Sequence, residues 1–185
     1  MATISPAEGE TLLFPSSLLP SRESLNLSEK ANGIEFRPLS RSDYVRGFYE
    51  CLGVLTWVGN PTEAEFHQRF DEMRDSKGTY HFVVAVMEEQ IVGTGCLVVE
   101  RKFIHNHGAI GHVEEIAIAK EHQGKGLGLA MMNVLDKLAI TAGCYKSILN
   151  CGPRTEQFYT RCGYHNSGIE MSRYFEEAQD SYHRG

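Results

Sequence analysis

The stretch "KEHQGKGLGLAMMNVLDKLA" (Lys120–Ala139) holds three glycines within five residues, directly before an apolar pattern with helical spacing. Glycine is unfavourable inside a helix, so this crowding at a helix start indicates that the backbone approaches another group closely. A glycine-rich turn between a strand and a helix presents several backbone N–H groups to one point, and the positive end of the helix dipole adds to their attraction for an anion. The stretch therefore predicts a phosphate or pyrophosphate site.

Two common phosphate-binding motifs do not match this stretch. A Walker A loop ends in Gly-Lys-Ser/Thr, which is absent here, and a Rossmann fingerprint has the spacing G-x-G-x-x-G on the first β-α unit. Here the spacing is G-x-G-x-G, and it follows four expected strands. The pattern that fits is Gln-x-x-Gly-x-Gly/Ala, written in this chain as Gln123-Gly124-Lys125-Gly126-Leu127-Gly128.

The whole chain predicts an α/β fold with the element order β-α-α-β-β-β-α-β-α-β. Alternating or continuous apolar runs predict strands at 34–38, 80–87, 91–104, 112–119 and 145–151, then a final extended segment at 164–175. Apolar residues at helical spacing predict helices that begin near Ser42 and Pro61, a helix at 127–142, and a short helix opened by Pro153. In the first of these, Leu55 continues the apolar face.

Bulk properties narrow the class of protein. The length of 185 residues predicts one domain at 33–185, preceded by a flexible or loosely docked arm at 1–32 whose "LLFPSSLLP" could enter a groove. A formal net charge of −6 argues against a nucleic-acid binder, and no apolar run approaches the roughly 20 residues of a membrane span. Five dispersed cysteines predict reduced thiols in a cytoplasmic protein, and the histidines at 105, 107 and 112 fit no zinc pattern, so no metal is expected.

The glycine pattern in its setting resembles the GCN5-related N-acetyltransferase superfamily over about residues 34–174. It follows "VEEIAIAKEH" and precedes an amphipathic helix, a strand and "FYTRCGY". This resemblance implies the superfamily's fold, a mixed and mainly antiparallel sheet flanked by helices, with acetyl-CoA bound as co-substrate. The cofactor-binding positions that it implies are Ile116, Ala117, Ile118, Gln123, Gly124, Lys125, Gly126, Leu127, Gly128, Leu129, Asn150, Thr155, Phe158 and Tyr159.

A narrower resemblance concerns the acceptor. "VLTWVG", "ERKFIH", "GHVEEIAI", "QGKGLG", "GCYKSIL" and "FYTRCGY" occur in the order seen in the eukaryotic glucosamine 6-phosphate N-acetyltransferases. This implies direct acetyl transfer to the 2-amino group of D-glucosamine 6-phosphate, on the route to UDP-N-acetylglucosamine. It also implies a homodimer, with a strand at 168–175 reaching the partner and the sugar-phosphate site near the interface. The implied substrate-binding positions are Thr56, Lys102, Phe103, Ile104, His105, Glu114, Glu115, Ile116, Tyr145, Lys146 and Arg173.

The expected chemistry needs a base and an acid. A sugar ammonium must lose a proton before its nitrogen attacks a thioester. Glu114 and Glu115 are adjacent on an expected strand, so strict alternation sends their side chains to opposite faces, and the resemblance assigns the base to Glu114. The resemblance also places Tyr159 near the CoA sulfur, where its phenol could protonate the leaving thiolate. The resemblance further implies that backbone N–H groups of 116–118 contact the acetyl carbonyl and the pantetheine arm, an oxyanion-type interaction in a bulged strand.

Three positions depart from the family pattern. Asn150 stands where many members have an acid, Thr155 stands where Asn is usual, and Tyr174 takes the place of a basic residue, with Arg173 beside it. Asn150 cannot act as a base but can orient a catalytic group through hydrogen bonds. Two alternatives therefore stay open: the same fold acetylating another small amine or a protein amine, and a non-catalytic CoA-binding regulator.

Overall fold

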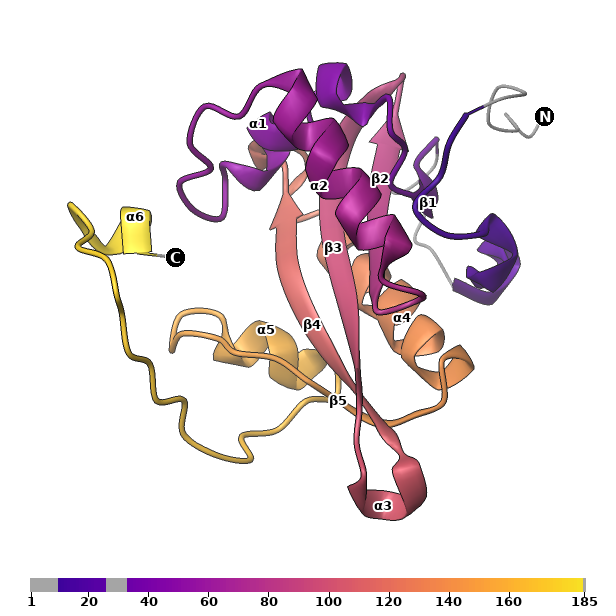
Figure 1. Cartoon of the computed structure of the whole chain (residues 1–185), viewed down its shortest axis with the longest axis vertical. Coiled ribbons are helices and arrows are strands. Elements are labelled where there is room, and N and C mark those ends of the chain that lie inside the picture. Colours follow the sequence, from indigo (N-terminus) through magenta and orange to yellow (C-terminus); the bar gives the residue numbers. More distant parts are fainter. Residues whose placement is uncertain (1–9, 26–32, 185) are drawn as a thin grey trace.

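The computed structural model describes residues 10–25 and 33–184, and its centre is one five-stranded sheet (Figure 1). The strands lie in the order β1 (Glu35–Pro38), β2 (Tyr80–Met87), β3 (Gln90–Arg101), β4 (Ala109–Ile118) and β5 (Cys144–Ile148). The first four pair antiparallel with their neighbours, and β5 pairs parallel with β4. The expected mixed, mainly antiparallel sheet is therefore confirmed.

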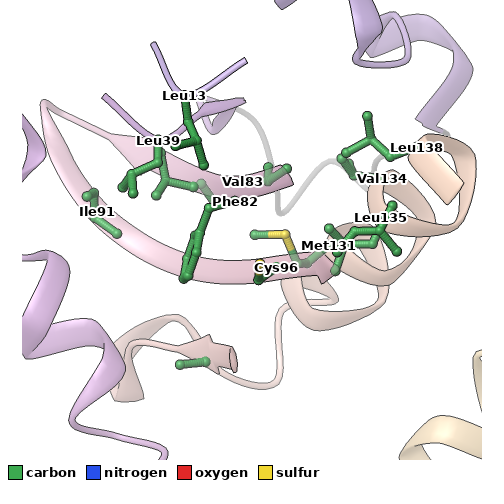
Figure 2. Packing of buried hydrophobic residues seen from close by; sticks show 14 of the residues in the cluster. Leu13, Leu39, Phe82, Val83, Ile91, Cys96, Met131, Val134, Leu135 and Leu138 are labelled. Carbon is green, nitrogen blue, oxygen red and sulfur yellow. The ribbon is translucent and has the colours of Figure 1, made fainter. Parts of the chain in front are cut away.

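Helices cover both faces of the sheet. The longer ones are α1 (Phe48–Leu52), α2 (Glu63–Asp75), α4 (Leu127–Thr141) and α5 (Glu156–Arg161). On one face, the ring of Phe48 lies 5.3 Å from that of Phe82 on β2. On the opposite face, α4 turns Met131 and Leu135 toward β3 (Figure 2). No helix in the described ranges is long and apolar enough to cross a membrane.

Short helical turns connect these elements. They are η1 (Ser16–Leu18), η2 (Arg22–Leu25), η4 (Asp43–Arg46), α3 (Ile104–His107), η5 (Lys120–His122) and α6 (Ser181–Arg184). The helix expected near Ser42 is split into η4 and α1 by Gly47, whose φ of 80° is left-handed, and Leu55 lies beyond α1 and is exposed. α2 begins after Thr62, which forms a capping box with Glu65.

The N-terminal residues 10–25 dock on the β1 side of the sheet. Leu13 and Phe14 are buried, and the N–H of Leu13 donates to the carbonyl of Leu39, so the two leucines lie side by side (Figure 2). The ring of Phe14 meets that of His81 edge-on at 5.0 Å. The described part of the expected arm therefore packs on the sheet through these two side chains. The remainder of the arm lies outside the described residues.

The prediction of a final strand at the C-terminal end is wrong for a single chain. Residues 164–175 form no strand, and β5 is the outer strand of the sheet in the part of the chain that the structure describes. Ile169, Met171 and Phe175 are each at least 87% exposed. An extended segment becomes a strand only when another strand satisfies its backbone groups, and no such neighbour is present here. The chain then returns to the loop after α1, where α6 lies (Figure 1).

Candidate functional site

Strand β5 pairs along its whole length with the first part of β4 only. Their pairing begins with Ala109 opposite Cys144 and ends with His112 opposite Ile148. Beyond this point β4 continues to Ile118, and β3 is its only paired neighbour among the described strands. The edge of β4 that faces away from β3 therefore presents backbone N–H and C=O groups to a bound molecule.

A β-bulge lies within this open part of β4. The register between β3 and β4 shifts between Thr94 and Cys96, and Glu115 has a left-handed φ of 53°. The buried hydroxyl of Thr94 donates a 2.9 Å hydrogen bond to the carbonyl of Glu115 and so holds the bulge. The expected bulge is present, but the expectation of strict alternation is wrong. Because the bulge inserts an extra residue, Glu114 and Glu115 are both exposed.

Gly95 lies opposite the bulge and provides the space that it needs. A Cβ at position 95 would lie 2.9 Å from Cδ1 of Ile116 and 2.9 Å from Cγ of Met131. Ile116 therefore occupies the space that a side chain at position 95 would need. Our sequence analysis did not select Gly95, although a glycine inside a strand pattern signals a bulge or a close approach.

Glu115 and Tyr159 have raised pKa values. Glu115 keeps contact with solvent, but the surrounding protein removes part of its hydration, and this desolvation, together with the charge of Glu114, raises its pKa. Burial raises the pKa of Tyr159, with smaller contributions from two cysteines and from Glu114. The phenol of Tyr159 is therefore neutral at physiological pH and holds a proton that it can donate. The charge of Glu114 influences both groups.

The glycine loop presents unpaired N–H groups at the start of α4. Gly124 and Gly126 have left-handed φ values of 70° and 85°, and Gly126 is the N-cap residue. The first helical bond runs from the N–H of Ala130 to the carbonyl of Gly126, so the N–H groups of 127–129 have no acceptor within the helix. A Cβ at Gly124 would meet no atom within 4 Å. The backbone of this loop is therefore open to an anion, as the sequence predicts.

The neighbouring loop residues hold this surface in place. The side-chain amide of Gln123 donates to the carbonyl of Ile118 at 2.9 Å and so ties the loop to the end of β4. Leu127 is 1% exposed and can reach a ligand only through its backbone. Gly128 lies against α5, because a Cβ there would stand 3.2 Å from Cζ of Phe158. The three glycines therefore serve both the loop conformation and the contact between two helices.

A cavity of about 920 Å³ lies along β5 and α5. Tyr145, Lys146, Asn150 and Tyr159 all line it, so the structure brings two expected catalytic residues together with two expected substrate residues. Thr155 is the N-cap residue of α5. Several predicted site residues are exposed along the open edge of β4, in the glycine loop and beside the cavity. They are Glu114, Glu115, Gln123, Gly124, Lys125, Gly126, Leu129, Asn150 and Thr155.

Basic groups gather at the tip of the β3–β4 hairpin. The ring of His105 stacks on that of Tyr145 at 4.3 Å, and Nζ of Lys146 lies 5.9 Å from the centre of the same ring. Three consecutive residues starting at His105 have left-handed φ values, a strained conformation that is common at functional positions. Lys102 lies at the same tip and forms an ion pair with Glu100. These contacts bring three of the expected substrate residues together.

One chain does not bring all the expected substrate residues together. Thr56 lies in the loop between α1 and α2, toward the end of the sheet opposite the β3–β4 tip (Figure 1). The guanidinium of Arg173 lies over the ring of Phe175, 5.5 Å from its centre, in the exposed C-terminal segment. Phe103 and Ile104 are exposed at the tip itself. A sugar-phosphate site that uses Thr56 and the tip together would need a second chain or a movement.

Metal-ligating side chains are dispersed. Within residues 10–25 and 33–184, no three His, Cys, Asp or Glu side chains gather closely enough to hold a metal ion. His112 instead lies 2.9 Å from a carboxylate oxygen of Glu100. All five cysteines are free.

Comparisons with known proteins identify the family and the fold. Residues 44–164 match the family described as Acetyltransferase (GNAT) family. Glucosamine 6-phosphate N-acetyltransferase 1 of Dictyostelium discoideum is 39% identical over 145 residues, which are 77% of this chain and 92% of that protein. Glucosamine 6-phosphate N-acetyltransferase of Arabidopsis thaliana is 39% identical over 149 residues, which are 79% of this chain and 99% of that protein. A crystal structure of the Arabidopsis thaliana glucosamine-6-phosphate N-acetyltransferase has a TM-score of 0.75 at 37% identity, covering 77% of this chain and 99% of that one.

Proposed function

The chain belongs to the GNAT acetyltransferase family, and we propose that it transfers acetyl from acetyl-CoA directly to the 2-amino group of D-glucosamine 6-phosphate. The family and the fold expected from the sequence are thereby confirmed. The products are N-acetyl-D-glucosamine 6-phosphate and CoA. The observation that carries this proposal is the open edge of β4, with the glycine loop at its end and Glu114 and Tyr159 near its bulge.

Acetyl-CoA supplies an activated thioester carbonyl when it is bound. The N–H groups of 127–129 and the positive end of α4 hold the diphosphate. Along the open edge of β4, the backbone of 116–118 orients the pantetheine arm and donates to the acetyl oxygen, on which charge develops during the reaction. The bulge at Glu115 sets the direction of these N–H groups, because it changes the register of β4 against β3.

Two side chains move the protons. Glu114 accepts a proton from the sugar ammonium, directly or through a water molecule, and so frees the nitrogen lone pair for attack. Tyr159, which burial keeps neutral, gives its phenolic proton to the departing sulfur. The nitrogen gives up a second proton as the amide forms, and this proton restores the phenol of Tyr159 after it has protonated the thiolate, so the proton taken by Glu114 is the one released overall. Asn150, in the same cavity as Tyr159, orients these groups through its amide.

The cations at the hairpin tip bind the 6-phosphate. Lys146 and His105 both lie against the Tyr145 ring, and Lys102 joins them by exchanging its partner Glu100 for the phosphate. Each charge-assisted bond to the phosphate contributes about 1.5–3 kcal/mol. Glu115 is placed to accept hydrogen bonds from the sugar hydroxyls.

We further propose that the enzyme is a cytoplasmic homodimer. The apolar side chains of 168–175 are exposed, and the outer edge of β5 carries no strand in the described part of the chain. A partner would pair this segment with a sheet edge and bring Arg173 and Thr56 into a shared substrate site. Five free cysteines agree with a reducing compartment. Activity should therefore fall on dilution into monomers, while a fully active monomer would refute the shared site.

A thiol-release assay with acetyl-CoA tests the reaction. The amine panel should contain glucosamine 6-phosphate, glucosamine, a polyamine, an amino acid and a peptide N-terminus. We expect glucosamine 6-phosphate to be the best acceptor and N-acetylglucosamine 6-phosphate to be the product. Preference for another amine would support the same fold with a different acceptor, and thiol release from none of them would support a CoA-binding regulator.

A further inference from the structure

The C-terminal turn at 180–183 folds back onto the loop that carries Thr56 (Figure 1). The backbone carbonyl of Tyr182 accepts a hydrogen bond from the hydroxyl of Thr56 and a second one, of 3.3 Å, from the N–H of Trp57. The phenol of Tyr182 donates to the carbonyl of Gly53 at 2.9 Å. One residue of the turn is thus bonded to both ends of the loop at 53–57.

The turn has its own internal support. One carboxylate oxygen of Asp180 accepts from the N–H of His183 at 3.0 Å and lies 2.8 Å from Nδ1 of the His183 ring. These two contacts lower the pKa of Asp180, so the carboxylate stays ionised at physiological pH. They also fix the imidazole beside Trp57, with ring centres 5.6 Å apart. The turn therefore presents a defined surface to the loop.

The bond to Tyr182 fixes what Thr56 can do. A threonine hydroxyl carries one proton and two lone pairs. Because the proton points to the carbonyl of Tyr182, both lone pairs remain for a donor on the other side. A hydroxyl or an ammonium of the acceptor sugar is such a donor. Without the turn, the hydroxyl rotates freely and must give up that freedom when the sugar binds.

We propose that the turn at 180–183 is a positioning element of the acceptor site, which holds Thr56 as a hydrogen-bond acceptor for the amino sugar. This inference rests on the proposed function, since the acceptor role of Thr56 comes from it. The carbonyl of Tyr182 acts through Thr56 and does not touch the sugar. The turn therefore affects sugar binding and has no part in the chemical step or in acetyl-CoA binding.

Steady-state kinetics of a chain that ends at Gln179 test this proposal. We expect KM for glucosamine 6-phosphate to rise about five- to tenfold, the loss of about one hydrogen bond, while kcat and KM for acetyl-CoA change less than twofold. Tyr182→Phe keeps the carbonyl and should have a smaller effect. Glu177→Gln, in the exposed segment before the turn, is the matched control and should resemble the wild type.

A double-mutant cycle with Thr56→Val separates positioning from a general structural effect. If the turn acts through Thr56, the truncation should not raise KM further in the Thr56→Val background. Additive effects of the two changes would overturn the proposal. An unchanged KM in the truncated protein would overturn it too, and a lowered KM would mean that the turn obstructs the site.

The single tryptophan of the chain, Trp57, gives a readout that does not depend on activity. Loss of His183 from its neighbourhood should increase quenching of its fluorescence by acrylamide in the truncated chain. Unchanged quenching would show that the turn does not lie on the loop. If the wild type accepts glucosamine but not its 6-phosphate, the proposed function fails, whereas the quenching result still reports on the turn.

Discussion

A methyl group on Gly95 would stand 2.9 Å from Cδ1 of Ile116, so this glycine and the isoleucine of the β4 bulge share one space. Real Cβ atoms essentially never come this close to another heavy atom. The bulge, and with it the direction of the N–H groups on the open edge of β4, therefore depends on the absence of a side chain on β3.

Gly95→Ala should accordingly lower both stability and turnover. Ile116, Met131 and Leu135 must shift to admit the methyl group, at a cost of about 1–3 kcal/mol in the free energy of unfolding. Urea unfolding measures this loss, and acetyl transfer by the folded variant measures the loss in kcat. Val45→Ala is the control, because this side chain is 71% exposed and has no role in the proposed site. Equal stability and kcat in the two variants would contradict the role of Gly95.

Glu114→Gln should lower kcat by about 100-fold or more, because an amide cannot accept the proton of the sugar ammonium. Glu115→Gln should act mainly on KM for the sugar. The two variants remove adjacent carboxylates from the same bulge and are therefore matched controls for each other. The assignment is wrong if Glu115→Gln abolishes turnover and Glu114→Gln retains it.

Tyr159→Phe should reduce kcat about 100-fold with little change in either KM, since it removes only the phenolic proton. Burial raises the pKa of Tyr159 above its ordinary value of 10.0, so this group stays protonated throughout the neutral range. Ionisation of this phenol should therefore not lower the wild-type rate below about pH 10. A pH–rate profile in which the alkaline decline near neutrality disappears in Tyr159→Phe would contradict the assigned acid.

His81 should make the fold sensitive to acid. Burial under Phe14 lowers the pKa of His81 below 6.5, so the unfolded chain binds a proton more readily than the folded one. Its neutral form is favourable at pH 7.5, and stability is lost as the pH falls through about 6.5. Urea unfolding at pH 7.5 and at pH 5.5 gives the free energy of unfolding at each pH. The difference between these two free energies should be smaller in His81→Phe than in the wild type. His165→Gln changes an exposed histidine and should leave this difference in free energy unchanged. If His81→Phe shows the same difference as the wild type, the assignment to His81 is refuted.

The sequence predicts the parts of the site that depend on local chemistry. The spacing from Gln123 to Gly128 predicts the turn and the helix start, because left-handed residues and unpaired N–H groups are properties of a few neighbouring residues. Apolar runs predict where the strands lie, whereas the mixed, mainly antiparallel sheet came from the resemblance to a family. Tyr159 and Asn150 were selected by their resemblance to a family, and the structure places both in one cavity.

Other parts depend on residues that are distant in the sequence. The exposure of both Glu114 and Glu115 follows from the register against β3 and from Gly95, which no local pattern of β4 contains. The segment at 164–175 has an extended pattern but no strand to pair with in the described chain. The contact between Tyr182 and Gly53 joins residues 129 positions apart, so only the folded chain reveals it.

The specificity for a phosphorylated amino sugar is the central claim, and kcat/KM for glucosamine 6-phosphate against that for glucosamine tests it most directly. We predict a ratio of about 100 or more, because His105 and Lys146 together supply charge-assisted bonds that only the phosphate can use. Lys146→Ala should lower this ratio at least tenfold and leave kcat/KM for glucosamine unchanged. Equal values for the two sugars in the wild type would contradict the account.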